Sequence, residues 1–290
     1  MTLHPANTEK TLLVITGPTA VGKTDYTISL AEQLGAPILS ADSRQMYREM
    51  KIGTAAPSAE ELARVPHYFI GNLSIHDYYN VSMFERQALE LLETLFLQHP
   101  VVIMTGGSPQ YIEAVCSGID ELPDPDPAIR QYVNQLFLQS GIEALRAQLS
   151  VLDPVFYGRV NHNDHKRMIR AVEVSLQVGK PYSSCLRQTV QQRSFTIVKR
   201  YLNRPRPVLF ERIGQRVDRM MEAGLPDEAR ALYPYRTLNA LNTVGYKELF
   251  SYMEGKCTLE QAVEDIKTHT RRYAKRQLTW FRKDYEEVML

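Results

Sequence analysis

Short apolar runs alternate with longer amphipathic segments along the first third of the chain. Residues 11–16, 37–41 and 101–104 form the apolar runs, which end at Gly, Pro or Asp or run into them. Such runs are typical of parallel strands buried on both faces. Residues 26–34 and 83–98 carry apolar positions at helical spacing. The alternation predicts an α/β fold, in which a parallel sheet with right-handed crossovers is flanked by helices.

The pattern changes at residues 122–127, Leu-Pro-Asp-Pro-Asp-Pro, where neither a helix nor a central strand can continue. Helical spacing dominates as far as about residue 192, and residues 195–198 are expected to return as a strand to the first sheet. We therefore predict a core of residues 1–121 and 195–290, with a helical insertion domain at 122–194. The helices predicted by spacing are 129–138, 142–149 and 165–178 in the insertion and 259–282 at the end of the chain.

Composition narrows the class of protein. The 290 residues are 44% hydrophobic and 23% charged, which excludes disordered, collagen-like and coiled-coil chains. No apolar run reaches the roughly eighteen residues that cross a bilayer, and the first ten residues lack the features of a secretory signal. Cys116, Cys185 and Cys257 are far apart and have no metal-ligand spacing. We expect a soluble cytoplasmic protein without a membrane partner.

The net charge of +1 hides local excess. Residues 267–283 hold seven basic residues and no acidic one, and residues 187–216 hold eight basic residues against Glu211 alone. Either run by itself fits a solvated helix face. Two such runs in one nearly neutral chain favour a site for a polyanion.

A phosphate-binding motif follows the first predicted strand and precedes the first predicted helix. The segment fits G-x-x-x-x-G-K-[ST], and this placement predicts a P-loop NTPase-like core. Its backbone N–H groups and lysine would bind a diphosphate at the helix N-terminus, while Thr24 would hold Mg²⁺. The eight predicted diphosphate ligands are Gly17, Pro18, Thr19, Ala20, Val21, Gly22, Lys23 and Thr24.

The rest of a nucleotide hydrolase is missing from the sequence. Residues 101–104 run into a threonine and two glycines, where an ATPase would have an apolar strand ending in a magnesium-binding aspartate. The acid that follows a predicted strand is Asp42. It and Ser108 are expected at the carboxyl edge of the sheet, where α/β proteins bind ligands. Asp42 has three possible roles: an indirect partner of Mg²⁺, a general base, or a helix cap.

Taken together, the motifs resemble one family, the tRNA dimethylallyltransferases, also called tRNA isopentenyltransferases. The resemblance covers nearly the whole chain, and the ordered set of motifs is specific. The matching segments are Gly17-Pro-Thr-Ala-Val-Gly-Lys-Thr24, Asp42-Ser-Arg-Gln-Met-Tyr47, Lys51-Ile-Gly-Thr-Ala-Ala-Pro57, Val65-Pro-His67, Gly106-Gly-Ser-Pro-Gln-Tyr111, Asn163-Asp-His-Lys-Arg-Met-Ile-Arg-Ala-Val-Glu173, Gly245-Tyr-Lys-Glu248 and Thr270-Arg-Arg-Tyr-Ala-Lys-Arg-Gln-Leu-Thr-Trp-Phe-Arg282.

The resemblance implies transfer of a dimethylallyl group from dimethylallyl diphosphate to N6 of the adenosine at tRNA position 37, directly 3′ of the anticodon. The phosphate loop would then hold the leaving diphosphate, with Mg²⁺ as cofactor. By the same resemblance, Asp42 is the general base, Ser108 orients the amine in place of a threonine, and Arg212 stabilises the diphosphate. Arg216 is the second candidate for the arginine.

The resemblance also implies contacts with the tRNA anticodon stem-loop. Near the flipped base it points to Asp42, Ser43, Arg44, Gln45, Tyr47 and Ser108. In the insertion it points to Arg130, Lys166, Arg167 and Arg170, where structural ion pairs remain the alternative for Arg130 and Arg167. The basic groups expected to line one face of the final helix are Arg271, Arg272, Lys275 and Arg276. Tyr273 and Trp280 are expected to be core anchors outside the site.

Three departures from the family pattern bear on activity. Ala56 stands where lysine is usual, Pro109-Gln110 replaces a glycine and an apolar residue, and Tyr68 replaces a common second histidine. Two alternative functions stay open: a small-molecule or nucleotide kinase, and a tRNA-binding protein that has lost catalysis. We expect the enzyme to act as a monomer.

Overall fold

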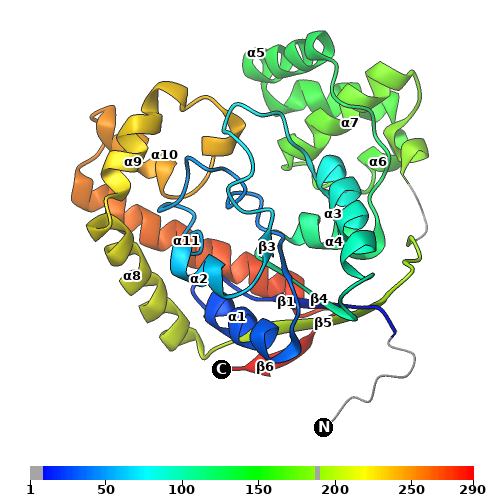
Figure 1. Ribbon diagram of the computed structural model, residues 1–290. Helices are drawn as coiled ribbons and strands as arrows, with labels where there is room; N and C mark the ends of the chain where they lie inside the picture. Colours follow the sequence, from blue (N-terminus) through cyan, green and yellow to red (C-terminus); the bar gives the residue numbers. More distant parts are fainter. Residues whose placement is uncertain (1–8, 187–189) are drawn as a thin grey trace. The chain divides into compact units, whose positions relative to one another are not determined.

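The computed structural model describes residues 9–186 and 190–290 (Figure 1). The first eight residues, where no signal peptide is expected, and Arg187, the first residue of a basic run, lie outside this part. The chain divides into two compact units, one formed by residues 1–117 and 192–290 and the other by residues 118–191. The insertion predicted at 122–194 overlaps the second unit with small shifts at both ends.

The first unit contains a six-stranded sheet in which every neighbouring pair of strands is parallel. The strand order is β3-β2-β4-β1-β5-β6, so the first strand of the chain lies inside the sheet. The α/β sheet and the four predicted strands, which are β1, β2, β4 and β5, are confirmed, whereas two short edge strands, β3 and β6, were not predicted. The bounds are β1 Thr11–Thr16, β2 Ile38–Ser40, β3 His67–Tyr68, β4 Val101–Gly106, β5 Thr196–Asn203 and β6 Glu286–Met289.

Helices cover both faces of this sheet because alternate strand residues point to opposite sides. On one face, Leu12 and Val14 pack in a core with α3 (Val81–Leu95) and α4 (Pro109–Ser117). On the other, Ile15 packs in a core with residues of α1 (Lys23–Leu34) and α8 (Arg206–Glu222). The short helix α2 spans Ala59–Arg64.

A third core in the first unit joins helices near the end of the chain. Its elements are α9 (Leu225–Leu232), α10 (Tyr246–Met253) and α11 (Leu259–Phe281), with 3₁₀ turns at Tyr233–Tyr235 and Asn239–Leu241. The predicted final helix is confirmed. α11 contributes Ile266 to this helical core, Ala274 to one sheet core and Phe281 to the other. One helix therefore connects all three cores.

The second unit is helical, as predicted, and has its own core. α5 (Pro127–Leu152) is broken at Gly141, whose φ of 69° is left-handed, so the two predicted helices meet there. α6 (Pro154–Tyr157), α7 (His165–Val178) and a 3₁₀ turn at Tyr182–Cys185 complete the unit. The fully buried side chains of this core are Val133, Leu145, Leu149, Met168, Ala171 and Val172.

Across residues 9–186 and 190–290, no helix combines the length and the apolar character that crossing a bilayer requires.

Candidate active site

The phosphate loop wraps between the end of β1 and the start of α1. Gly17 and Gly22 have φ values of 149° and 105°, which favour glycine. A Cβ at Gly17 would lie 2.7 Å from the carbonyl oxygen of Leu202. Lys23 begins α1, and its ammonium donates hydrogen bonds to the carbonyl oxygens of Gly17 (2.9 Å) and Pro18 (3.0 Å). The predicted strand-loop-helix context is therefore present.

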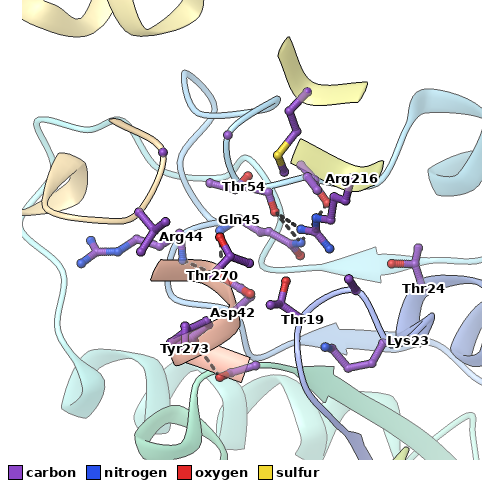
Figure 2. A pocket seen from close by; sticks show the side chains of 18 of the residues that line it. Thr19, Lys23, Thr24, Asp42, Arg44, Gln45, Thr54, Arg216, Thr270 and Tyr273 are labelled. Carbon is purple, nitrogen blue, oxygen red and sulfur yellow. Dashed lines mark hydrogen bonds between the residues drawn. The ribbon is translucent and has the colours of Figure 1, made fainter. Parts of the chain in front are cut away.

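The ammonium of Lys23 is enclosed by protein and has no directly bonded carboxylate among the described residues. Burial lowers the pKa of Lys23 to about 7. The nearby Arg216 guanidinium also lowers this pKa, and the Asp42 carboxylate raises it. Figure 2 shows Lys23 and Thr24 beside the loop, with Asp42 and Arg216 in the same cavity. The loop is a site of excess positive charge, suited to a diphosphate.

Asp42 follows β2 and lines this cavity. Its Oδ1 accepts hydrogen bonds from the backbone N–H of Arg44 (3.0 Å) and of Gln45 (3.4 Å). That oxygen therefore caps the turn. This is close to the capping role that was one of the three possible roles of Asp42. A Cβ at Gly107 would lie 3.7 Å from the other oxygen, Oδ2. The two oxygens can thus take separate roles, one structural and one facing Gly107.

Ser108 follows β4 and is held next to the turn that begins at Asp42. Its Oγ accepts a hydrogen bond from the backbone N–H of Ser43 (3.0 Å) and donates one to Ser43 Oγ (3.1 Å). The sheet register places Ser40 opposite Thr105, which brings the carboxyl ends of β2 and β4 to one edge. The structure therefore brings Asp42, Ser43 and Ser108 together, as predicted.

Three arginines surround the phosphate loop. Nε of Arg212 donates to the carbonyl oxygen of Ala20 (2.8 Å), and Nε of Arg204 donates to that of Val21 (2.8 Å). Arg216, one turn after Arg212 on α8, donates to the carbonyl oxygen of Thr54 (3.4 Å). Burial lowers the pKa of the Arg216 guanidinium. Both predicted arginines therefore line the cavity, and Arg204 was missed.

α11 closes the cavity with polar side chains that sequence reasoning placed elsewhere or did not consider. Tyr273 Oη donates to the carbonyl oxygen of Gly107 (3.0 Å), although this tyrosine was expected outside the site. Gln277 bonds both Gly107 and the backbone of Thr19. The sequence did contain a sign of this polar wall. Thr270, Tyr273 and Gln277 are three and four residues apart, so their polar groups lie along one side of a helix.

The cavity has a volume of about 610 Å³ and lies wholly within the first unit. The phosphate loop, Asp42 and the α8 arginines line its polar part. Val217, Leu225 and Ile266 are almost fully buried and contribute an apolar wall. The larger apolar residues that line the cavity are Val217, Met220, Leu225, Val244 and Ile266.

Three further residues were expected near the flipped base, namely Arg44, Gln45 and Tyr47, and only the first two line the cavity. Nε2 of Gln45 donates to the carbonyl oxygens of Thr54 (3.3 Å) and Ala55 (3.1 Å), so this side chain shapes the cavity wall. Arg44 lines the cavity, and its guanidinium donates to the carbonyl oxygen of Asn239 (3.0 Å). The Tyr47 side chain is only 8% exposed and packs in the helical core, so the structure does not bring it to the cavity.

In the second unit, two of the predicted arginines are tied to one buried acid. Arg130 forms a two-point ion pair with Glu173 (3.0 and 3.2 Å), whose side chain is 2% exposed. Arg170 lies 3.7 Å from Glu173 and donates to the carbonyl oxygen of Pro123 (2.8 Å). Arg167 pairs with Asp164 at 3.3 Å, and Lys166 is exposed. The ion-pair alternative is realised for Arg130 and Arg167.

On α11, Arg272, Lys275 and Arg276 are exposed, while Arg271 is partly buried. Lys275 lies over the ring of Phe210 at 5.6 Å, and Arg276 lies over that of Tyr273 at 5.7 Å. These cation–π contacts fix the side-chain stems and leave an exposed basic surface.

The residues around Thr24 suit a magnesium ion shared with a ligand. Nowhere in the described part of the chain do three His, Cys, Asp or Glu side chains gather as a metal site. Thr24 lines the cavity beside Lys23. Mg²⁺ keeps several waters and binds substrate phosphates with few protein ligands, so one hydroxyl next to a phosphate loop fits this ion.

Comparisons with known proteins agree with this geometry. The family model described as IPP transferase matches residues 45–284. The chain belongs to the IPP transferase family. A tRNA dimethylallyltransferase 2 of Porphyromonas gingivalis is 50% identical over 276 residues, covering 95% of this chain and 92% of the relative. A tRNA dimethylallyltransferase of Christiangramia forsetii is 50% identical over 275 residues, covering 95% and 91%.

Solved structures of related proteins have the same fold. The tRNA isopentenylpyrophosphate transferase of Bacillus halodurans matches this IPP transferase family chain with a TM-score of 0.69 and 36% identity, covering 97% of this chain and 90% of that one. A eukaryotic dimethylallyltransferase acting on tRNA gives a TM-score of 0.77 at 24% identity, covering 97% and 74%, and supports the fold alone.

The structure shows where the three residues that depart from the expected family pattern lie. Pro109 is the first residue of α4, where the missing N–H of proline breaks no helical hydrogen bond. Ala56 lines the cavity, and Tyr68 packs against a sheet core. Pro109 is therefore compatible with the helix, and Ala56 places a small apolar side chain in the cavity wall.

Proposed function

We propose that this chain transfers a dimethylallyl group from dimethylallyl diphosphate to N6 of adenosine 37 in tRNA, giving N6-(dimethylallyl)adenosine and diphosphate. The observation that carries the proposal is that one cavity combines a cationic phosphate loop, the Asp42–Ser108 pair and an apolar wall. These parts match the three chemical elements of the reaction: a diphosphate, an amine that loses a proton, and an apolar tail.

The phosphate loop and the α8 arginines would bind the diphosphate. Backbone N–H groups of the loop, Lys23, Arg212 and Arg216 surround the place where negative charge grows as the bond from carbon to oxygen breaks. Fixed donors and cations of this kind stabilise a leaving group without reorganisation. Magnesium held at Thr24 would supply further positive charge to the same oxygens.

Asp42 and Ser108 would act on the acceptor. Adenosine 37 must leave its stack to enter the cavity. There Ser108 Oγ would orient the exocyclic amine. The bond from N6 to the allylic carbon forms, the bond from that carbon to the diphosphate oxygen breaks, and the proton of N6 passes to Asp42. Oδ1 of Asp42 caps the turn, which leaves Oδ2 for the proton.

Basic side chains would hold the anticodon stem-loop. Arg272, Lys275 and Arg276 offer exposed charge to RNA phosphates. Lys166 does so in the second unit, where the neighbouring Arg167 is paired with Asp164. Arg130 and Arg170 would instead order the Glu173 cluster that supports the second unit. We expect the enzyme to act as a monomer in the cytoplasm.

The decisive measurement is the transfer of labelled dimethylallyl to an unmodified tRNA with adenosine at position 37. We expect label on that nucleoside, a requirement for Mg²⁺, no label when position 37 is guanosine, and no ATP consumption in a parallel reaction. ATP turnover would support a kinase instead. Salt-sensitive tRNA binding without transfer would support a binding protein that has lost catalysis.

Asp42→Asn tests the assignment of the base. Asparagine keeps an oxygen that can cap the turn but cannot accept the proton, so we expect kcat to fall by about 10²- to 10⁴-fold with tRNA affinity retained. Single-turnover rates and a tRNA binding titration measure the two effects separately. If tRNA affinity collapsed together with the rate, the role of Asp42 would be structural.

A further inference from the structure

The side chain of Gln277 joins the two halves of the cavity. It is 2% exposed and lies on α11. Its Oε1 accepts a hydrogen bond from the backbone N–H of Thr19 (2.9 Å), in the phosphate loop. Its Nε2 donates one to the carbonyl oxygen of Gly107 (2.8 Å), directly before Ser108. One amide therefore spans from the donor site to the acceptor site.

Both ends of this bridge continue into the proposed machinery. Gly107 also accepts a hydrogen bond from Tyr273 (3.0 Å), so α11 holds that carbonyl group twice. Ser108 bonds the backbone of Ser43, which follows Asp42. A Cβ at Gly107 would lie 2.5 Å from Nε2 of Gln277, so a larger residue at position 107 would displace this amide. A continuous set of hydrogen bonds runs from the phosphate loop to the Asp42 turn.

Packing alone does not explain an amide at position 277. Its neighbours on the same side of α11, Ala274 and Phe281, are fully buried and apolar. An apolar side chain of similar length would fill the space, whereas a buried amide is costly unless its polar atoms are bonded. Here both are bonded, and both partners are backbone groups of loops that line the cavity.

We propose that Gln277 is a positioning residue that sets the distance between the phosphate loop and the Ser108–Asp42 pair. This inference rests on the proposed function. Transfer requires the allylic carbon, held through its diphosphate, to lie at attacking distance from an amine held by Ser108. Because each loop holds one reactant, the bridge between the loops controls the alignment of the two reactants and has little part in the binding of either.

Gln277→Met is the direct test. Methionine has similar length and volume but forms neither hydrogen bond. We expect kcat to fall about 100-fold, the size of effect that a misplacement near 1 Å causes, with little change in the KM for dimethylallyl diphosphate or in tRNA affinity. The matched control is Gln261→Met, which makes the same change at an exposed position of α11 away from the cavity, where the amide bonds Asp265.

Two further variants separate the span of the bridge from its chemistry. Gln277→Asn keeps both functional groups on a stem one methylene shorter, so we expect it to be impaired like the methionine variant. Gln277→Glu keeps the oxygen that accepts from Thr19 and loses the N–H that bonds Gly107, so we expect an intermediate rate if the carboxyl is ionised. Thermal unfolding of each variant shows whether α11 is still packed.

The possible outcomes are distinct from one another. A Gln277→Met enzyme with the wild-type kcat, or one whose loss is confined to KM, would overturn the inference. Full activity of the asparagine variant would also overturn it, since the bridge would then not need its length. If the wild-type chain itself transfers nothing to tRNA in the same assay, the proposed function has failed rather than the role of Gln277.

Discussion

The charge of the phosphate loop depends on whether Lys23 is protonated. Its pKa lies near 7 because burial and Arg216 both disfavour the charged ammonium. Below that pH the lysine is protonated and attracts a diphosphate. Above it the unliganded site loses the proton, and a bound diphosphate would have to restore it. Affinity for the donor should therefore decline as pH rises through 7.

We expect the Kd for dimethylallyl diphosphate to increase between pH 6.5 and 8.5 in the wild-type chain by about tenfold for each pH unit above the pKa. Lys23→Arg should remove this dependence, because a guanidinium stays charged throughout the range. Calorimetric titration across the pH series measures it. The arginine variant also controls for titration of the diphosphate itself, so a decline of equal size in both proteins would contradict the assignment to Lys23.

Residues of the site differed in how far sequence could place them. The phosphate loop was predictable because its function depends on eight consecutive residues. Gln277 was not, because its two partners lie 258 and 170 residues away along the chain. Tyr47 carries a family motif position, but its ring packs in the helical core, and this depends on helices that close only in the folded chain.

At the scale of the element, the side of α8 that faces the cavity changes from charged to apolar along the helix. Arg212, Arg216 and Met220 are spaced four residues apart, so each step advances about 6 Å along the helix. The first residue contacts the phosphate loop, the second contacts Thr54, and the third is apolar. The order from charged to apolar matches a short allylic diphosphate with its head at the loop.

Met220→Ala should therefore widen the end of the site that receives the tail. We expect the ratio of kcat/KM for geranyl diphosphate to that for dimethylallyl diphosphate to rise at least tenfold, since each methylene in an apolar pocket is worth about 10- to 200-fold in selectivity. Competition between the two diphosphates on one tRNA measures the ratio. Met221→Ala is the matched control, because Met221 packs in the helical core and does not line the cavity. An equal shift in both variants would assign the effect to loosening of the core.

Elements with a strong period were predictable, and those without one were not. The run at 11–16 and the helix at 259–282 follow directly from apolar spacing. β3 has two residues and β6 is mostly exposed, so neither carries the apolar pattern of a buried strand. Their pairing depends on neighbours in the sheet, which single-sequence patterns do not contain.

At the scale of the whole molecule, the even balance of charge conceals an uneven distribution. Exposed basic groups gather on α11, although the chain carries +1 overall. The sequence predicted this concentration from the run at 267–283, while the ion pairs that occupy Arg130 and Arg170 required the structure.

We expect tRNA affinity to fall steeply as salt concentration rises. Arg272→Ala with Lys275→Ala should weaken binding and reduce the slope of log K against log salt by about 0.7 to 0.9 for each phosphate that is no longer neutralised. Fluorescence titrations at several salt concentrations give the slope. Arg64→Ala removes a cation already paired with Glu32 and should leave the slope unchanged. An unchanged slope in the α11 variant would place the tRNA elsewhere.

The position of β1 inside the sheet has a consequence for how the chain is made. β1 ends at Thr16, but its neighbour β5 ends only at Asn203, after the whole second unit. At the usual pace of the ribosome, about 10 to 40 s separate the synthesis of the two strands. During that time the central strand has an open, apolar edge. A nascent chain of this protein is therefore a natural client for chaperones, and a prematurely terminated one should be cleared by proteolysis because it can complete neither the sheet nor the active site.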